Sequence, residues 1–210
     1  MSAVDWVSHP PGVRDAAACP EQSEQGASPS ATLRQSRSTE HAGARAAGQD
    51  WLVWNGMVRR LSKKDAEGCD ATIRSLPYFF GQEAGIANCA SAVRTQAGLV
   101  AVDDTGAVLG FLTHESHYPL SAEITWMAVR QDFRGLGIGR RLIARLVDDA
   151  TANGLHILFV VTLGPSAPEP GVTDTYGGTR RFYERTGFVP LKELDSGGPD
   201  SPGLVFARPV

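Results

Sequence analysis

A glycine-rich stretch, Arg134-Gly135-Leu136-Gly137-Ile138-Gly139, limits what this chain can fold into more than any other feature. A strand-like apolar run ends before it at Val129, and an amphipathic helical pattern begins after it near Arg140. The first N–H groups of a helix have no partner within the helix and carry about half a positive charge. Glycines let the backbone approach an anion closely. A strand, a glycine turn and a helix start in this order therefore predict a phosphate-binding site.

Two common nucleotide-binding motifs do not fit this stretch. The dinucleotide fingerprint G-x-G-x-x-G requires a third glycine, but Arg140 or Leu142 stands there, depending on which glycine is counted first. The mononucleotide P-loop requires Lys and then Ser or Thr after its last glycine, and Arg140 and Arg141 occupy those positions. A glycine turn that only allows a helix to pack closely on a strand is the structural alternative.

A second motif follows after a helical pattern and a long apolar run: Thr179-Arg180-Arg181-Phe182-Tyr183-Glu184-Arg185-Thr186-Gly187-Phe188. Together with the spacing Arg134-x-x-Gly137-x-Gly139, it resembles the GNAT N-acetyltransferase superfamily in both content and order. The strand from Ile124 to Val129 also resembles the fourth strand of that family. The resemblance covers about residues 57–210, and we expect the GNAT domain to span residues 56–210.

Strand-like and helix-like runs alternate from Gly56 onward and predict an α/β fold, with α and β elements around one mixed sheet. Turn-forming residues at 103–106 predict a hairpin, and Ser62 with Asp65 forms a capping box before a helix. Strands are expected over 57–61, 98–102, 108–113, 123–129, 155–163, 188–191 and 204–207, and helices over about 62–74, 83–93, 140–153 and 179–186. The family resemblance implies a mostly antiparallel central sheet, flanked by helices, in which the fourth and fifth strands splay apart.

Composition limits the kinds of partner and the cellular compartment that we expect for this protein. Residues 1–50 are rich in Ala, Ser, Gly, Gln and Pro, so we expect a disordered N-terminal extension. The net charge of -3 and the lack of a basic stripe argue against a nucleic-acid partner. No apolar run reaches the length of a membrane span and no secretory signal is evident. The three cysteines are widely spaced, which fits a reducing cytoplasm and indicates neither a disulfide framework nor a metal site.

The resemblance implies that acetyl-CoA, as cosubstrate and without a metal, lies between the fourth and fifth strands. Its pantetheine arm would pair with the fourth strand, and its pyrophosphate would contact the glycine loop. The residues implied are Met127, Ala128, Val129, Arg134, Gly135, Leu136, Gly137, Ile138, Gly139 and Arg140. Arg140 could instead be a solvated helix cation. Many family members carry Asn six residues before the Phe-Tyr pair; Tyr176 stands there, and its hydroxyl is a candidate for an equivalent contact.

Acyl transfer to an amine needs a base, because an alkylammonium with a pKa of ~10.4 is not a nucleophile at neutral pH. It also needs donors for the developing oxyanion and an acid for the departing thiolate. The resemblance implies Tyr183 as that acid; the alternative is a core tyrosine beside Phe182. Glu123, at the start of the fourth strand, is the candidate base. Competing candidates stand at the end of the third strand, in an expected loop: His114, Glu115 and His117.

The implied function is an acyltransferase that moves an acetyl group from acetyl-CoA to a primary amine by direct attack in a ternary complex. Alternatives are a non-catalytic acyl-CoA sensor of the same fold and an N-acyltransferase that uses another acyl-CoA. The acceptor is expected to be an amine of a small molecule or a protein. The Pro- and Gly-rich segment 164–178 is either an inert loop or a determinant of acceptor specificity. A homodimer is a candidate assembly, since dimers are the commonest homo-oligomers.

Overall fold

The computed structural model of the chain describes residues 54–77, 79, 83–166, 174–194 and 202–210. The predicted disordered extension, residues 1–50, lies outside the described residues, and so does the middle of the segment 164–178. The helices and strands of the described residues all fall within the same compact unit.

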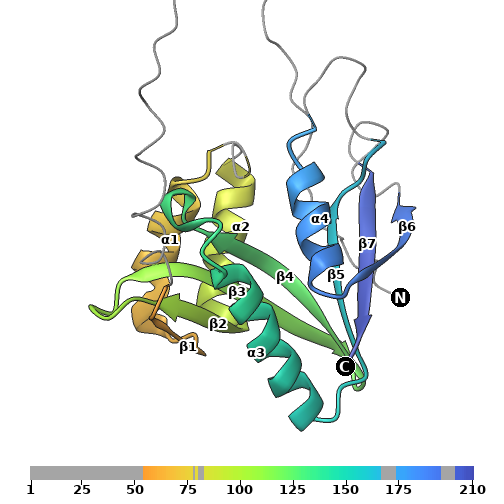
Figure 1. Ribbon diagram of the computed structural model, residues 1–210, viewed down its shortest axis with the longest axis horizontal. Helices are drawn as coiled ribbons and strands as arrows, with labels where there is room; N and C mark the ends of the chain where they lie inside the picture. Colours follow the sequence, from red (N-terminus) through yellow and green to blue (C-terminus); the bar gives the residue numbers. More distant parts are fainter. Residues whose placement is uncertain (1–53, 78, 80–82, 167–173, 195–201) are drawn as a thin grey trace, which may run out of the picture. The chain divides into compact units, whose positions relative to one another are not determined.

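Within the described residues, seven strands form one mixed sheet in the order β1-β2-β3-β4-β5-β7-β6 (Figure 1). Neighbouring strands are antiparallel except β4 and β5, which run parallel. The strands are β1 (Met57–Arg60), β2 (Ala97–Val102), β3 (Val108–Tyr118), β4 (Ser121–Val129), β5 (Ile157–Leu163), β6 (Val189–Leu194) and β7 (Gly203–Pro209). The mixed α/β class and the mostly antiparallel sheet that the sequence predicts are confirmed.

Helices pack on both faces of this sheet (Figure 1). They are α1 (Ala66–Arg74), α2 (Glu83–Thr95), α3 (Ile138–Ala152) and α4 (Gly177–Arg185), with short 3-10 segments η1 (Lys63–Asp65) and η2 (Gln131–Phe133). One hydrophobic cluster joins α3 and α4 to the sheet, and a second joins α1 and α2 to it. In β2, Leu99 and Ala101 belong to the first cluster and Val100 and Val102 to the second, as the alternation of strand side chains requires.

Two element boundaries differ from the sequence-based expectation in ways that matter for function. β3 continues well past Thr113 to Tyr118, so His114, Glu115 and His117 lie in a strand and the expected loop is wrong. Their polar side chains give no apolar alternation from which a strand could be recognised. α3 begins at Ile138, not near Arg140, because Gly137 takes a left-handed conformation with φ of +81° and acts as the N-cap.

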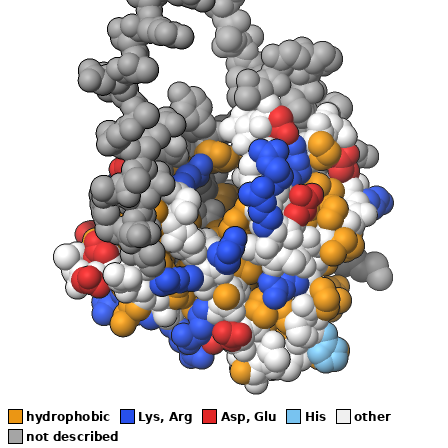
Figure 2. All heavy atoms as spheres, in the orientation of Figure 1, with side chains coloured by type: hydrophobic (Ala, Val, Ile, Leu, Met, Phe, Trp, Pro, Cys, Tyr) orange, Lys and Arg blue, Asp and Glu red, His pale blue; other side chains and the backbone are white. Residues whose placement is uncertain are grey.

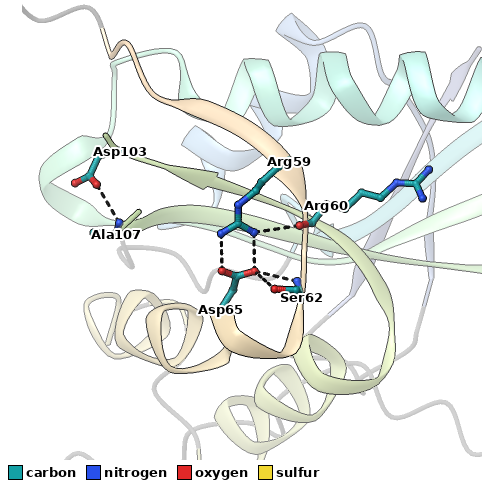
Figure 3. Close-up of polar contacts among 6 residues, drawn as sticks. All are labelled: Arg59, Arg60, Ser62, Asp65, Asp103 and Ala107. Atoms are coloured by element: carbon teal, nitrogen blue, oxygen red, sulfur yellow. Dashed lines mark hydrogen bonds and ion pairs between the residues drawn. The ribbon is translucent and has the colours of Figure 1, made fainter. Parts of the chain in front are cut away.

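A buried ion pair fixes the start of α1 (Figure 3). Asp65 is 5% exposed, and its carboxylate oxygens accept two hydrogen bonds of 2.7 Å from the guanidinium of Arg59. Its Oδ2 also accepts bonds from the backbone N–H and the hydroxyl of Ser62, at 2.9 and 2.7 Å. The Arg59 guanidinium, supported by Ser62, holds the pKa of Asp65 at about 2. The predicted capping box is therefore present, and it is reinforced by an arginine that sequence reasoning did not connect to it.

The hairpin predicted at residues 103–106 is also present, between β2 and β3. Oδ1 of Asp103 accepts a hydrogen bond of 2.9 Å from the N–H of Ala107 (Figure 3). It accepts another of 2.9 Å from the N–H of Thr105, and the two bonds close the turn. Two surface hollows of about 450 and 330 Å³ lie beside this turn, and both are lined in part by Lys64 and Gly106. Neither is lined by the glycine loop, α4 or β5, so these hollows are separate from those elements.

Candidate active site

The sheet opens where β4 and β5 part. Their pairing runs from Ser121–Ile157 to Ile124–Val160 and stops there. Beyond that point β4 continues to Val129 beside β3, and β5 continues to Leu163 beside β7 (Figure 1). This divergence is the splay that the family resemblance implies. Among the described residues, β5 forms no strand pairs with residues 127–129 of β4, so the backbone groups of these three residues could hydrogen-bond to a ligand.

A β-bulge marks the point of divergence. Thr113 of β3 pairs with Trp126, but His114 pairs with Ile124, so Thr125 is an extra residue in β4. The Thr125 hydroxyl donates to Oε1 of Gln96 at 2.5 Å, and therefore the Thr113 hydroxyl, 2.8 Å away, donates to Thr125. Sequence reasoning missed this bulge, because one extra residue in a strand has no compositional signal.

The glycine loop lies at the N-terminus of α3. Gly135 and Gly137 both have positive φ, +82° and +81°. The N–H of Arg141 donates to the Gly137 carbonyl at 3.0 Å, and no side chain caps the helix. The amides of residues 138–140 therefore precede the first intrahelical bond, as an anion site requires. The exposed Arg140 and Arg141 follow directly, and Figure 2 shows basic side chains gathered over α3 and α4.

Gly139 brings three elements together. A Cβ at this position would lie 3.1 Å from Cε2 of Phe182 on α4 and 3.2 Å from Cε of Met127 on β4. Both distances are shorter than an ordinary van der Waals contact. A side chain at residue 139 would therefore press on Met127 and Phe182, so the glycine lets the first turn of α3 pack closely on β4 and α4. This packing role is compatible with a role of the same turn in binding phosphate.

Arg134 and Tyr176 meet at Phe79. The Arg134 guanidinium lies 4.7 Å from the centroid of the Phe79 ring, and burial lowers the pKa of Arg134. The Tyr176 ring meets Phe79 edge-on, with centroids 5.5 Å apart, and its hydroxyl donates to the Phe79 carbonyl at 3.4 Å. Residue 79 lies between α1 and α2, so this cluster connects that segment to the glycine loop and to the N-terminus of α4.

Tyr183 is buried among aromatic side chains of the α3 and α4 cluster. Ring centroids of Phe182, Phe188 and Phe206 lie 5.3, 5.5 and 6.1 Å from that of Tyr183. Burial raises the pKa of the Tyr183 phenol well above its ordinary value, which keeps the hydroxyl protonated at neutral pH. The residue thus has the environment of a core tyrosine, and its protonated hydroxyl could also donate a hydrogen bond to a thiolate.

Glu123 is buried in the paired part of β4, just before the splay. Only 8% of its side chain is exposed, and its Oε2 lies 2.7 Å from Nε2 of His117. The other two candidate bases are elsewhere. His114 pairs with Ile124, which belongs to the α3 side of the sheet, and burial lowers the pKa of its imidazole. Glu115 accepts a hydrogen bond of 3.1 Å from Gln96 at the end of α2.

The described ends of the segment 164–178 are tied to the domain. The Ser166 hydroxyl donates to Glu193 of β6 at 2.6 Å. Arg180 of α4 donates to the Leu163 carbonyl at 2.9 Å and forms an ion pair with Asp174. In the part of the chain that the structure describes, no group of three His, Cys, Asp or Glu side chains could hold a metal ion. None of the described helices has the length and apolar character needed to cross a membrane.

Comparisons with known proteins identify the family to which these features belong. Residues 94–190 match the family model described as an acetyltransferase (GNAT) domain. The fold is shared with a GNAT-family protein from Desulfovibrio desulfuricans, with a TM-score of 0.64 and 22% identity over 73% of this chain and 98% of that chain. Residues 94–190 therefore match a GNAT acetyltransferase domain, and the resemblance found in the sequence is confirmed.

Two further solved structures share the fold and were obtained with a coenzyme. One is an aminoglycoside 6′-N-acetyltransferase complexed with coenzyme A, at a TM-score of 0.57 and 17% identity over 73% of this chain and 96% of that chain. The other is yncA from Salmonella typhimurium with its cofactor acetyl-CoA, at a TM-score of 0.56 and 16% identity over 74% of this chain and 94% of that chain. No curated protein sequence matches the chain.

Proposed function

We propose that this protein is an N-acetyltransferase that moves an acetyl group from acetyl-CoA to a primary amine by direct attack in a ternary complex. The observation that carries this proposal is the position of the glycine loop at the start of α3, where Gly139 lies against Met127, in the part of β4 (residues 127–129) with which β5 does not pair. Anion-binding amides next to these backbone groups suit a ligand with a pyrophosphate at one end and an amide-containing arm at the other. The coenzymes in the two neighbours above support the same assignment.

The residues present fit such a ligand. Amides from Gly135 to Arg140 would hold the pyrophosphate, with Arg134 and Arg140 supplying positive charge. Backbone groups of residues 127–129 would pair with the pantetheine arm, and one of their N–H groups would stabilise the developing oxyanion. Gly139 supports this fit, since a side chain there would fill the space between Met127 and Phe182. Acetyl-CoA would supply an activated acetyl thioester, and the chain's own groups would handle the protons.

Glu123 is the proposed base. It is buried, it lies next to the splay, and it has no Arg or Lys partner among the ion pairs of the described residues. Its carboxylate takes a proton from the alkylammonium form of the acceptor, which breaks an N–H bond and forms an O–H bond at Glu123. The neutral amine then has a lone pair with which to attack the thioester.

Tyr183 is the proposed acid. Because burial raises its pKa, the phenol keeps its proton at neutral pH and is available as a hydrogen-bond donor. As the C–S bond breaks, the Tyr183 O–H would donate a hydrogen bond to the negative charge that develops on the sulfur, and any proton passed to the sulfur would be replaced from water. Tyr176, in place of the family's Asn, contacts Phe79 in the described structure, so its contact with the coenzyme remains a proposal.

A non-catalytic acyl-CoA sensor is the second candidate, and the aromatic packing of Tyr183 is the observation that favours it. The substitution Tyr183→Phe separates the two. The assay follows release of the coenzyme A thiol with a panel of primary amines, including an aminoglycoside, a polyamine and a peptide. An enzyme should lose turnover roughly 100-fold or more while its Kd for acetyl-CoA stays the same.

The matched control is Tyr118→Phe, which removes a hydroxyl from a side chain that is 75% exposed. It should leave turnover and binding unchanged. Binding of acetyl-CoA with no turnover on any amine in the wild-type protein would favour the sensor over the enzyme. Turnover that Tyr183→Phe leaves intact would keep the enzyme but remove Tyr183 as its acid.

A further inference from the structure

Two carboxylates are buried among the described residues, and their partners differ. Asp65 is held by the guanidinium of Arg59, and its pKa is lowered to about 2, so it cannot act as a base at neutral pH. Glu123 is held by the imidazole of His117. A buried carboxylate needs a hydrogen-bond partner, but a neutral imidazole supplies one without a permanent positive charge. His117 thus gives Glu123 a hydrogen-bond partner that is not a permanent cation, unlike Arg59 beside Asp65.

The geometry of β3 brings His117 to Glu123. Glu115 pairs with Glu123 and Tyr118 pairs with Ser121, so the register between β3 and β4 shifts by one residue in this interval. His117 lies within the shifted interval, and its Nε2 reaches Oε2 of Glu123 at 2.7 Å. The same imidazole lies 6.3 Å from the ring of Phe159, which is the β5 partner of Glu123. His117 therefore contacts both strands just before they part.

We propose that His117 is a positioning residue for the base of the acyl transfer, which rests on the function proposed above. The His117 Nε2–H donates to Oε2 of Glu123 and fixes the carboxylate in one orientation. Oε1 is then the oxygen that takes the amine proton. His117 keeps its own proton throughout, and Glu123 returns the proton it has gained to water after the product leaves. The imidazole is 40% exposed, so it contacts the buried carboxylate without belonging to the core.

Two substitutions of His117 distinguish a role as hydrogen-bond donor to Glu123 from a role in packing alone. His117→Phe keeps an aromatic ring beside Phe159 but removes the N–H donor. His117→Gln places an amide N–H near the position of Nε2 and carries no charge at any pH. Loss of a hydrogen bond to a charged group should lower kcat roughly 10- to 100-fold in His117→Phe. In His117→Gln, kcat should stay within about threefold of wild type, because the donor is kept.

The acetyl-CoA Kd should be the same in both variants as in wild type, since His117 lies in the paired part of the sheet and not in the glycine loop. The Tm should be unchanged in His117→Gln, whereas His117→Phe should lower it modestly, because the buried Glu123 carboxylate then loses a hydrogen-bond partner. In a Glu123→Gln background, adding His117→Phe should cause no further loss, because the two residues act as one unit. Equal loss in His117→Phe and His117→Gln, or loss in neither, would overturn the positioning role. A wild-type protein without turnover would overturn the proposed function itself, and this inference with it, which distinguishes the two failures.

Discussion

The buried pair Arg59–Asp65 predicts a specific dependence of stability on pH. Hydrogen bonds from Arg59 lower the pKa of Asp65 from 3.8 to about 2 in the folded chain. Because the folded-state pKa is the lower one, ionised Asp65 stabilises the fold at pH values above about 4. That contribution is lost as the pH falls from about 4 towards about 2. At about 1.4 kcal/mol per pKa unit, the shift corresponds to roughly 2 kcal/mol of unfolding free energy.

The substitution Asp65→Asn tests this value. It removes the negative charge and leaves the partly buried Arg59 without a counterion, so we expect a loss of about 2 to 4 kcal/mol at pH 7. The measurement is urea denaturation followed by circular dichroism, at pH 7 and again near pH 2. At the lower pH most of the difference between wild type and variant should disappear, since pH 2 lies at the folded-state pKa of Asp65 and most of the stabilisation by its charge is then lost.

A second Asp–Arg pair provides the control. Asp70 of α1 accepts two hydrogen bonds from Arg94 of α2, at 3.1 and 2.6 Å, but the Arg94 side chain is 43% exposed. Water screens such a pair, so Asp70→Asn should change the unfolding free energy little at either pH. Equal losses in the two variants, or an Asp65→Asn loss that persists at pH 2, would refute the idea that burial makes the Arg59–Asp65 pair the stronger of the two.

Other predictions concern the glycine loop, the bulge and the thiols. Gly137→Ala places a Cβ at a φ of +81°, so it should destabilise the fold by about 1 kcal/mol and weaken acetyl-CoA binding. Gly137→Asn should cause a smaller loss of stability and of affinity, both measured by calorimetry, because Asn tolerates this conformation better. Equal losses in the two variants would contradict the backbone argument. Thr125→Val leaves the Gln96 carbonyl and the Thr113 hydroxyl without their partner, so turnover should fall while Thr95→Val, at an exposed hydroxyl, should leave it unchanged. Cys69 and Cys89 are fully buried, and burial raises the pKa of Cys69 to about 12, so a Cys19→Ser variant should react with a thiol reagent only after unfolding. Reaction of the folded variant would show that the core opens.

The sequence predicts the order of elements well because strongly patterned segments decide it. The apolar run that ends at residue 163 predicts a strand, and the helical period after residue 138 predicts a helix. Both patterns are strong enough to be recognised without knowing what packs against them. The glycine loop could be placed at a helix start for the same reason. Its exact cap, Gly137, could not, since Gly139 lowers helix propensity inside the turn where the helix in fact begins.

The contact between His117 and Glu123 could not be predicted from the sequence. It depends on β3 continuing through polar residues to Tyr118 and on a register shift against β4. Both are set by pairing between strands, which leaves no periodic signal in either strand alone. The sequence therefore named His117 and Glu123 as competitors for one role, whereas the structure brings them together as hydrogen-bonded partners.

A thermal-shift titration of the full chain with acetyl-CoA tests the central claim most directly, with NAD and ATP as controls that also carry phosphates. A ligand that binds only the native state adds about 2.7 kcal/mol of stability at 100 times its Kd, so the Tm must rise with concentration. We predict a rise with acetyl-CoA that is absent with both controls and weakened in Gly137→Ala. A folded sample whose Tm is unchanged by acetyl-CoA would contradict the proposed site and the proposed function together.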